Sequence, residues 1–235
     1  IPSNELNDQF VEYFDERVKF RTDSDFATEN LTGIYTLEFS LKSGESGGIS
    51  NPEYLAKLEE FRNWFKTDER VLQVSTFSTV MKKLNKNMHG DDPDYYRLPE
   101  SRNLAAQYLL LYEMSLPYGL DLNNQINVDK SSTRFTVTLV NVTTKEIKEI
   151  ADRAEYWLSE NAPEPMFATA ASSSVMFAHI AERNIKSMLT GTTIALVIIS
   201  LLMIAALRSL KFGLISLMPN LIPAILAFGL WGLLI

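Results

Sequence analysis

The stretch that decides the fold runs from Ser187 to Leu207 and reads SMLTGTTIALVIISLLMIAAL. Its 21 residues carry no charge, and after the turn at residues 208–211 the 24 residues 212–235 are uncharged as well. A bilayer core of about 30 Å is crossed by roughly 20 apolar residues at a rise of about 1.5 Å per residue. Core helices of soluble proteins seldom run this long without a polar face. Each stretch is therefore predicted to span a membrane, and the two together form a transmembrane hairpin.

The turn between the two predicted spans indicates their orientation. Arg208 and Lys211 are its only charged residues, and short basic turns stay on the cytoplasmic side of a membrane. We therefore predict a multi-pass protein of the inner cell membrane, with residues 1 to about 180 in the periplasm or outside the cell. Lys186, at the outer end of the first span, is compatible with this orientation because a lysine side chain can extend to the interface.

The second predicted span carries Pro219, Asn220 and Pro223 in its first half. One interpretation places these residues in the interior of a helix bundle, where the carbonyls freed by proline and the polar amide find partners. The other interpretation places residues 218–220 at the membrane edge, where polar groups cost little. The sequence favours neither interpretation over the other.

Composition separates this hairpin from an acidic domain. The chain has 235 residues and a net charge of −7. All 29 acidic residues and all but three of the 22 basic residues precede Lys186, which leaves residues 1–185 at −10. This charge excludes a nucleic-acid partner, and the lack of cysteine excludes disulfides and thiolate metal ligands. The chain starts at Ile1 without a signal peptide and is still apolar at Ile235, so we expect a piece of a longer membrane protein.

Sequence patterns predict an α+β domain over residues 1–172. We expect strands at residues 35–41, 70–77, 122–128, 133–142 and 166–170, helices at 3–15, 52–67 and from 143 to Pro163, and an irregular segment at 21–30. A helical insertion occupies residues 78–120. Without it the order is β-α-β followed by β-α-β, the ferredoxin-like split arrangement, in which two helices cover one face of an antiparallel sheet.

Residues 173–235 are predicted to form the membrane part of the chain. No helix breaker lies between Ser174 and Arg208, so a long helix is expected to continue from the domain into the first span at about residues 187–207. The turn at residues 208–211 follows, and the second span covers about residues 212–235, where the sequence is truncated. Such a helix would couple the outer domain to the membrane.

No motif in the sequence indicates catalysis or a bound cofactor. The acidic loop at residues 91–94 lacks the spacing of a calcium loop, and His89 and His179 have no partners at zinc-ligand spacing. Ser172–Ser174 lies at a strand-to-helix junction, where serine commonly caps a helix, and lacks the turn of a hydrolase nucleophile. We predict no catalytic residue, no metal, no cofactor and no enzymatic activity.

Several short motifs together resemble those of a known family. They are Leu31-Thr32-Gly33, Arg97-Leu98-Pro99, QYLLLYE at residues 107–113, Gly119-Leu120-Asp121-Leu122, ALRSLKFGL at residues 206–214, and Pro219-Asn220-Leu221-Ile222-Pro223. With the architecture above, they are similar to the resistance–nodulation–division (RND) superfamily, especially its predicted exporters of the mycobacterial membrane protein large (MmpL) group and its sterol-sensing-domain proteins. The resemblance covers nearly the whole chain.

The resemblance implies one repeat's porter-like outer domain with its two following spans. Its partners would be membrane lipids, a hydrophobic or lipid-like substrate, the remaining transmembrane helices and second repeat of the parent protein, and in some cases further copies of that protein. Transport in the family is driven by the proton gradient through acidic residues in a later span. Neither span here contains an ionisable residue, so no proton-relay residue can be assigned in this chain.

These features predict a proton-motive-force-driven exporter of lipid-like or hydrophobic compounds. The outer domain would handle the substrate, and the long helix would couple it to the spans. Two alternatives remain open: a lipid- or sterol-sensing receptor of the same architecture that does not pump, and a two-span anchor for a periplasmic binding domain. The charges of the neighbouring spans in the parent sequence would distinguish them.

Overall fold

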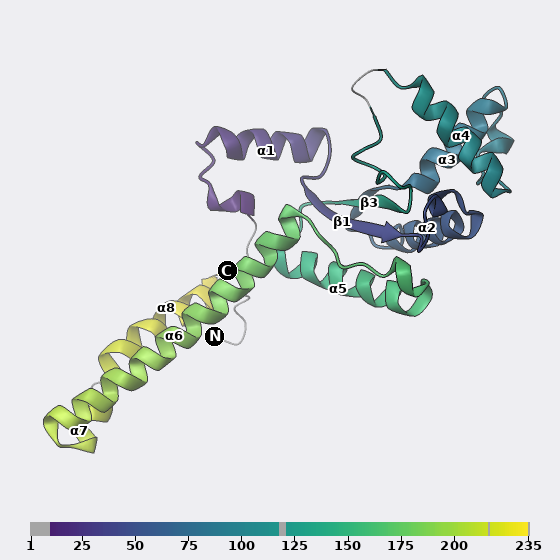
Figure 1. Ribbon diagram of the computed structural model, residues 1–235. Coiled ribbons are helices and arrows are strands. Elements are labelled where there is room, and N and C mark those ends of the chain that lie inside the picture. The colour runs from purple at the N-terminus through teal and green to yellow at the C-terminus, as the bar shows by residue number, and fades with distance from the viewer. Residues whose placement is uncertain (1–9, 118–120, 216, 235) are drawn as a thin grey trace. The chain divides into compact units, whose positions relative to one another are not determined.

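The computed structural model describes residues 10–117, 121–215 and 217–234 (Figure 1). The protein is mixed α/β, with a small antiparallel sheet and one long apolar helix. The chain divides into two compact units, Gln9–Ala178 and Ile1–Asp8 together with His179–Ile235.

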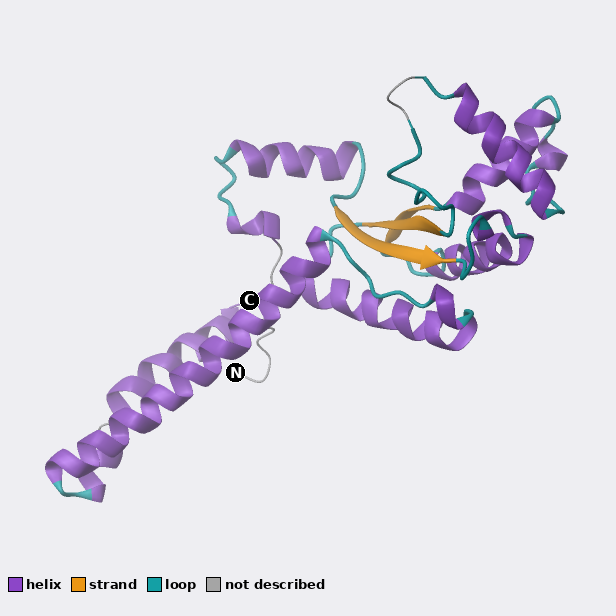
Figure 2. Ribbon diagram, viewed as in Figure 1, coloured by secondary structure: helices purple, strands orange, loops and turns teal. Residues whose placement is uncertain are grey.

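A three-stranded antiparallel sheet forms the centre of the unit Gln9–Ala178 (Figure 2). Its strands are β1 (Tyr35–Lys42), β2 (Val71–Ser75) and β3 (Ser132–Leu139), in the order β1-β3-β2. β1 and β3 pair over their whole length, whereas the pairing of β2 with β3 is irregular between Val71 and Gln73. The strands predicted at residues 35–41, 70–77 and 133–142 are thus present.

The two other predicted strands do not form. In the segment 122–128 only Ile126 pairs, with Thr133. In the segment 166–170, Met166 ends the 3-10 helix η4 (Glu164–Met166) and residues 167–170 are irregular, and it is the next residue, Ala171, that pairs with Glu38 of β1. Proline cannot donate to a strand ladder, and the two prolines at residues 163 and 165 start this segment in a helical turn.

Two helices cover one face of the sheet, α2 (Pro52–Phe65) and α5 (Thr144–Asn161). Phe61 of α2 joins the layers: its ring centroid lies 4.8 Å from Phe135 of β3, 5.6 Å from Phe39 of β1 and 4.9 Å from Trp157 of α5. All three phenylalanines are fully buried. The predicted period-2 pattern of β1 and β3 therefore places its apolar side chains in the core.

Local capping sets where these two helices begin. Asn51 accepts a hydrogen bond from the backbone N–H of Glu53, with Pro52 in the first position of α2. Before α5, the Thr143 side chain accepts from the N–H of Glu146, whose carboxylate accepts from the N–H of Thr143. Both caps are recognisable sequence signals, an Asn followed by Pro and a Thr with Glu three residues later.

The insertion between β2 and β3 is helical, as predicted. It comprises α3 (Phe77–Met88), η3 (Pro93–Tyr95) and α4 (Arg102–Ser115). The buried side chain of Asn85 holds it together, since it donates to the carbonyl of Arg97 at 3.0 Å and accepts from the Tyr108 hydroxyl at 3.1 Å. A 2.6 Å ion pair between Lys82 and Glu59 joins α3 to α2.

The segment before β1 differs from the prediction. Of the helix expected at residues 3–15, residues 3–9 lie outside the described part, and Phe10–Tyr13 forms the 3-10 helix η1. Residues 21–30 were expected to be irregular, but they belong to α1 (Lys19–Asn30), which contains no buried residue. A 2.7 Å ion pair between Arg21 and Asp25, at i,i+4 spacing, stabilises this helix locally. Because α1 lacks an apolar stripe, the hydrophobic pattern could not indicate it. A further 3-10 helix, η2 (Gly48–Ser50), precedes α2.

The last part of the chain contains three helices in its described residues: α6 (Ser173–Leu207), α7 (Leu210–Ile215) and α8 (Met218–Leu234). Within the described residues, α6 is the one helix long and apolar enough to cross a membrane, and few of its side chains are buried. The turn is shorter than predicted, because the helix resumes at Leu210. Arg208 makes this turn in the left-handed region, with φ of 49°.

A glycine allows α7 to return against α6. A Cβ atom at Gly213 would lie 3.1 Å from the Cα of Ile204 and would overlap the isoleucine side chain. The stretch 212–235, predicted as the second span, contains most of α7 and the 17-residue α8. Pro219 lies in the first turn of α8, where a proline fits because its missing N–H has no helical acceptor.

We expect Phe61→Ala to lower the free energy of unfolding by about 3–5 kcal/mol, because it removes a fully buried ring that contacts both the sheet and α5. Urea unfolding followed by tryptophan fluorescence measures the change. Phe26→Ala is the matched control, since Phe26 is 61% exposed, and it should change stability by less than about 0.5 kcal/mol. Equal losses for both variants would contradict the central role of Phe61.

Candidate functional site

The residues predicted as notable in the second span lie along α7, α8 and the turn before them. Arg208 and Lys211 are exposed, as are Pro219 and Pro223. Pro223 lies inside α8 and has no N–H to donate to the carbonyl of Pro219, four residues earlier. The side chain of Asn220 lies outside the described part. These positions thus provide a free backbone carbonyl and two exposed cations but no acid–base pair.

The other motifs considered in the sequence have local structural partners. Asp92 accepts a hydrogen bond from the N–H of Asp94 and so caps η3. His89 stacks on Tyr95 with a centroid distance of 3.6 Å. Ser172 accepts from the N–H of Val175 at the start of α6, as expected of a cap. Among the described residues, no three metal-ligating side chains gather in one place.

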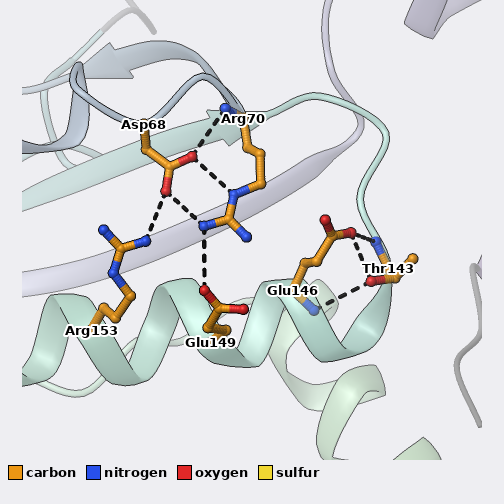
Figure 3. A network of polar contacts seen from close by, with 6 residues as sticks. All are labelled: Asp68, Arg70, Thr143, Glu146, Glu149 and Arg153. Carbon is orange, nitrogen blue, oxygen red and sulfur yellow. Dashed lines mark hydrogen bonds and ion pairs between the residues drawn. The ribbon is translucent and has the colours of Figure 1, made fainter. Parts of the chain in front are cut away.

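A network of charged residues joins the start of β2 to α5 (Figure 3). The carboxylate of Asp68 accepts from Nε and Nη2 of Arg70 at 2.9 and 2.8 Å, and from Nη1 of Arg153 at 3.1 Å. Nη2 of Arg70 also lies 3.6 Å from a carboxylate oxygen of Glu149. The guanidinium of Arg153 lies over the ring of Trp64, 5.7 Å from its centroid.

The electrostatics of this network indicate a structural role. Hydrogen bonds from Arg70 lower the pKa of Asp68 to about 2. The pKa of Glu146 is also lowered, chiefly by the backbone N–H of Thr143. A carboxylate that stays ionised throughout the physiological pH range cannot accept and release a proton there. The network therefore fixes β2 on α5 and does not carry protons.

The best candidate for a binding site is a hollow of about 330 Å³ on the opposite face of the sheet from α2 and α5. Outward-facing side chains of β1 and β3 line it, namely Glu38, Ser40, Ser132 and Arg134. The segment 123–127 and Ala171 complete its lining. Strand alternation produces this arrangement, because residues that alternate with the buried ones point to the other face.

The lining of the hollow is fixed by backbone contacts. The N–H of Arg134 donates to the carbonyl of Gln125 at 2.8 Å, and Oδ1 of Asn127 accepts from the N–H groups of Ser131 and Ser132, both at 2.9 Å. Ala171 and Glu38 exchange two backbone hydrogen bonds of 2.7 and 3.1 Å on the other side. One side of the hollow is thus formed by the paired strands β1 and β3, and another side by the turn segment 123–127, which these bonds tie to β3.

One ion pair dominates the charge of this hollow. Nη2 of Arg134 lies 2.5 Å from Oε1 of Glu38, so the two charges cancel. The exposed amides of Asn124 and Gln125 make no described side-chain hydrogen bond, which leaves them available to a ligand. This site was not predicted from the sequence. The sequence contains a Glu and an Arg at outward positions of two strands. That these two side chains lie close together can be inferred only when the register between the strands is known.

The fold comprises a mixed α/β domain with a small hollow on its sheet, followed along the chain by a helix long and apolar enough to cross a membrane. Comparisons with models of known protein families, with curated proteins and with solved structures find no match to this chain.

We expect Asp68→Asn to destabilise the protein by roughly 2 kcal/mol at pH 7, because the pKa of Asp68 falls from 3.8 to about 2 on folding. A carboxylate with a lowered pKa stabilises the fold above its unfolded pKa and loses this effect as the pH falls through the folded pKa. The unfolding free energies of the parent and the variant should therefore converge between about pH 4 and pH 2. The exposed Asp152→Asn on α5 is the control, and a pH-independent difference for Asp68→Asn would contradict the linkage.

Proposed function

We propose that this chain is part of a proton-motive-force-driven RND-type transporter, similar to the MmpL-like predicted exporters, that exports lipid-like or hydrophobic compounds. The observation that carries the proposal is the combination of the long apolar helix α6 with a tight basic turn and a second apolar helical segment, all following an α/β domain. The short motifs quoted above supply the resemblance to this family. The unit Gln9–Ala178 is the porter-like outer domain in this proposal.

We assign that domain to the ferredoxin-like split fold. The antiparallel order β1-β3-β2 supports the assignment, as does the position of Ala171, which pairs antiparallel with the outer edge of β1. If the segment around Ala171 counts as a fourth strand, the order becomes 4-1-3-2, with both crossing helices on one face. This is the arrangement expected of two β-α-β halves.

In this proposal the hairpin passes through the inner membrane twice. Arg208 and Lys211 lie on the cytoplasmic side, and residues 1 to about 180 are periplasmic. The large apolar side chains of α6 support the membrane location, because they are exposed where a soluble protein would bury them, for example Leu201 at 59% and Leu202 at 64%. In a bilayer these side chains contact lipid tails or neighbouring helices.

Helix α6 is the coupling element of the proposed transporter, and the outer domain handles the substrate. Its 35 residues form one helix without an internal proline, so a movement at one end can be transmitted along the backbone. The energy source lies elsewhere, since the uncharged stretches contain no group that could carry a proton. The proposal therefore requires acidic residues in later spans of the parent protein, and a second repeat to complete the transport path.

The absence of ionisable residues in both stretches also favours a second candidate, a lipid- or sterol-sensing receptor that shares the architecture without pumping. A third candidate, a two-span anchor for a periplasmic binding domain, would need no further spans. Transport that depends on a proton gradient distinguishes the exporter from both of these alternatives.

The test uses the full-length parent protein in proteoliposomes that contain a lipid labelled with a nitrobenzoxadiazole group. We expect movement of the label between leaflets to accelerate when a pH gradient is imposed and to return to the protein-free rate when a protonophore is added. Replacement of the intramembrane acids of the later spans by amides should have the same effect as the protonophore. If the labelled lipid moves between leaflets at the same rate with and without the pH gradient, the exporter proposal is overturned and the receptor is favoured.

A further inference from the structure

The hollow on the open face of the sheet has a chemical character that selects among ligands. Its charged groups, Glu38 and Arg134, lie 2.5 Å apart and cancel each other. An anion would have to displace the Glu38 carboxylate from the guanidinium, and it would approach a domain that carries a net charge of −10. A cation would compete with Arg134 for that carboxylate. The hollow therefore disfavours ions of either sign.

The remaining groups in the hollow offer donors and acceptors in similar numbers. The amides of Asn124 and Gln125 each carry one carbonyl oxygen and one NH₂ group, and the hydroxyls of Ser40 and Ser132 both donate and accept. Arg134 uses Nη2 for Glu38, so its other N–H groups can donate further. A hydroxyl group is matched to such a surface, because it also donates and accepts.

The shape of the hollow limits the size of its ligand. A volume of about 330 Å³ is at the small end of the range of about 300–1,000 Å³ that is typical of ligand sites. Its floor is two fully paired strands, and its side is held by the bonds from Gln125 and Asn127. The backbone of the hollow is therefore already positioned, and on binding the main ordering cost falls on the free amide side chains of Asn124 and Gln125.

We propose that this hollow binds a neutral, polyhydroxylated group of the size of a small sugar or polyol. The group is either the headgroup of a lipid or a free polyol, and both present the same hydroxyls. If it is a headgroup, this inference deepens the proposed function and rests on it, since the headgroup would then belong to the exported lipid. The binding itself depends only on the residues of the hollow.

The experiment uses the full chain in nanodiscs and measures binding by isothermal titration calorimetry. In the first arm, free maltose and myo-inositol are titrated and the heat of binding is measured. In the second arm, the nanodiscs contain glucosyl diacylglycerol, or plain diacylglycerol as the reference. This arm is read by the chemical-shift changes of labelled Asn and Gln amides. Binding of the free compounds or perturbation by the glucosyl lipid supports the proposal and identifies the source. No response in either arm overturns it.

Two sets of variants tie the binding to the hollow. The double variant Asn124→Ala with Gln125→Ala should weaken binding at least tenfold, whereas Gln107→Ala, an exposed amide on α4, should leave it unchanged. Glu38→Gln leaves the guanidinium of Arg134 without its carboxylate partner, so it should raise the affinity for glucose 6-phosphate relative to maltose. If Glu38→Gln does not shift this preference, the charge-cancelling argument is wrong.

The outcomes separate this inference from the proposed function. Polyol binding that persists while the parent protein shows no gradient-dependent flux would reject the exporter and keep the binding site. Another outcome is that the double variant Asn124→Ala, Gln125→Ala loses polyol binding and still shows gradient-dependent flux. That result would exclude the hollow from the transport path and would leave the exporter proposal in place.

Discussion

The constraint on which the structure depends is the exposure of an apolar helix with no polar face. Helix α6 has a stretch of 21 residues without charge, and the large side chains along it are exposed in the described structure. Water would penalise this surface, whereas the hydrocarbon of a bilayer accepts it. Lipid also demands that every backbone group be satisfied within the segment, which only a helix achieves for a single chain. After α6 the chain turns at Arg208 in the left-handed region, and Gly213 lets α7 pack closely against Ile204 of α6.

The α/β domain is stabilised from one side only, because one face of its small sheet is covered by helices and the other face is open. Phe61 and its aromatic neighbours bury the covered face under α2 and α5, and the charged network around Asp68 fixes the short strand β2 to α5. Three strands are then enough for a stable sheet with a polar face. That face carries the Glu38–Arg134 pair and the hollow beside it.

Much of the fold could be predicted from the sequence because its signals are local. The alternation in β1 and β3, the caps at Asn51 and Thr143 and the apolar run of α6 each depend on near neighbours in the chain. Helix α1 was missed because no apolar stripe indicates it, and the strand expected at residues 166–170 was wrong because prolines start that segment in a turn. In the stretch predicted as the second span, the chain forms the end of α7 and then α8. The hollow could not be predicted, since it needs the register between β1 and β3 and the position of a segment that forms only one bridge.

The most direct measurement of the central claim, that α6 crosses the membrane with the α/β domain outside, is cysteine accessibility. The chain contains no cysteine, so single substitutions Glu160→Cys at the end of α5 and Ser209→Cys in the turn give a clean label. In spheroplasts, a membrane-impermeant maleimide should label Glu160→Cys at once and Ser209→Cys only after the membrane is permeabilised. Labelling of both residues in intact spheroplasts, or of Ser209→Cys alone, would contradict this account.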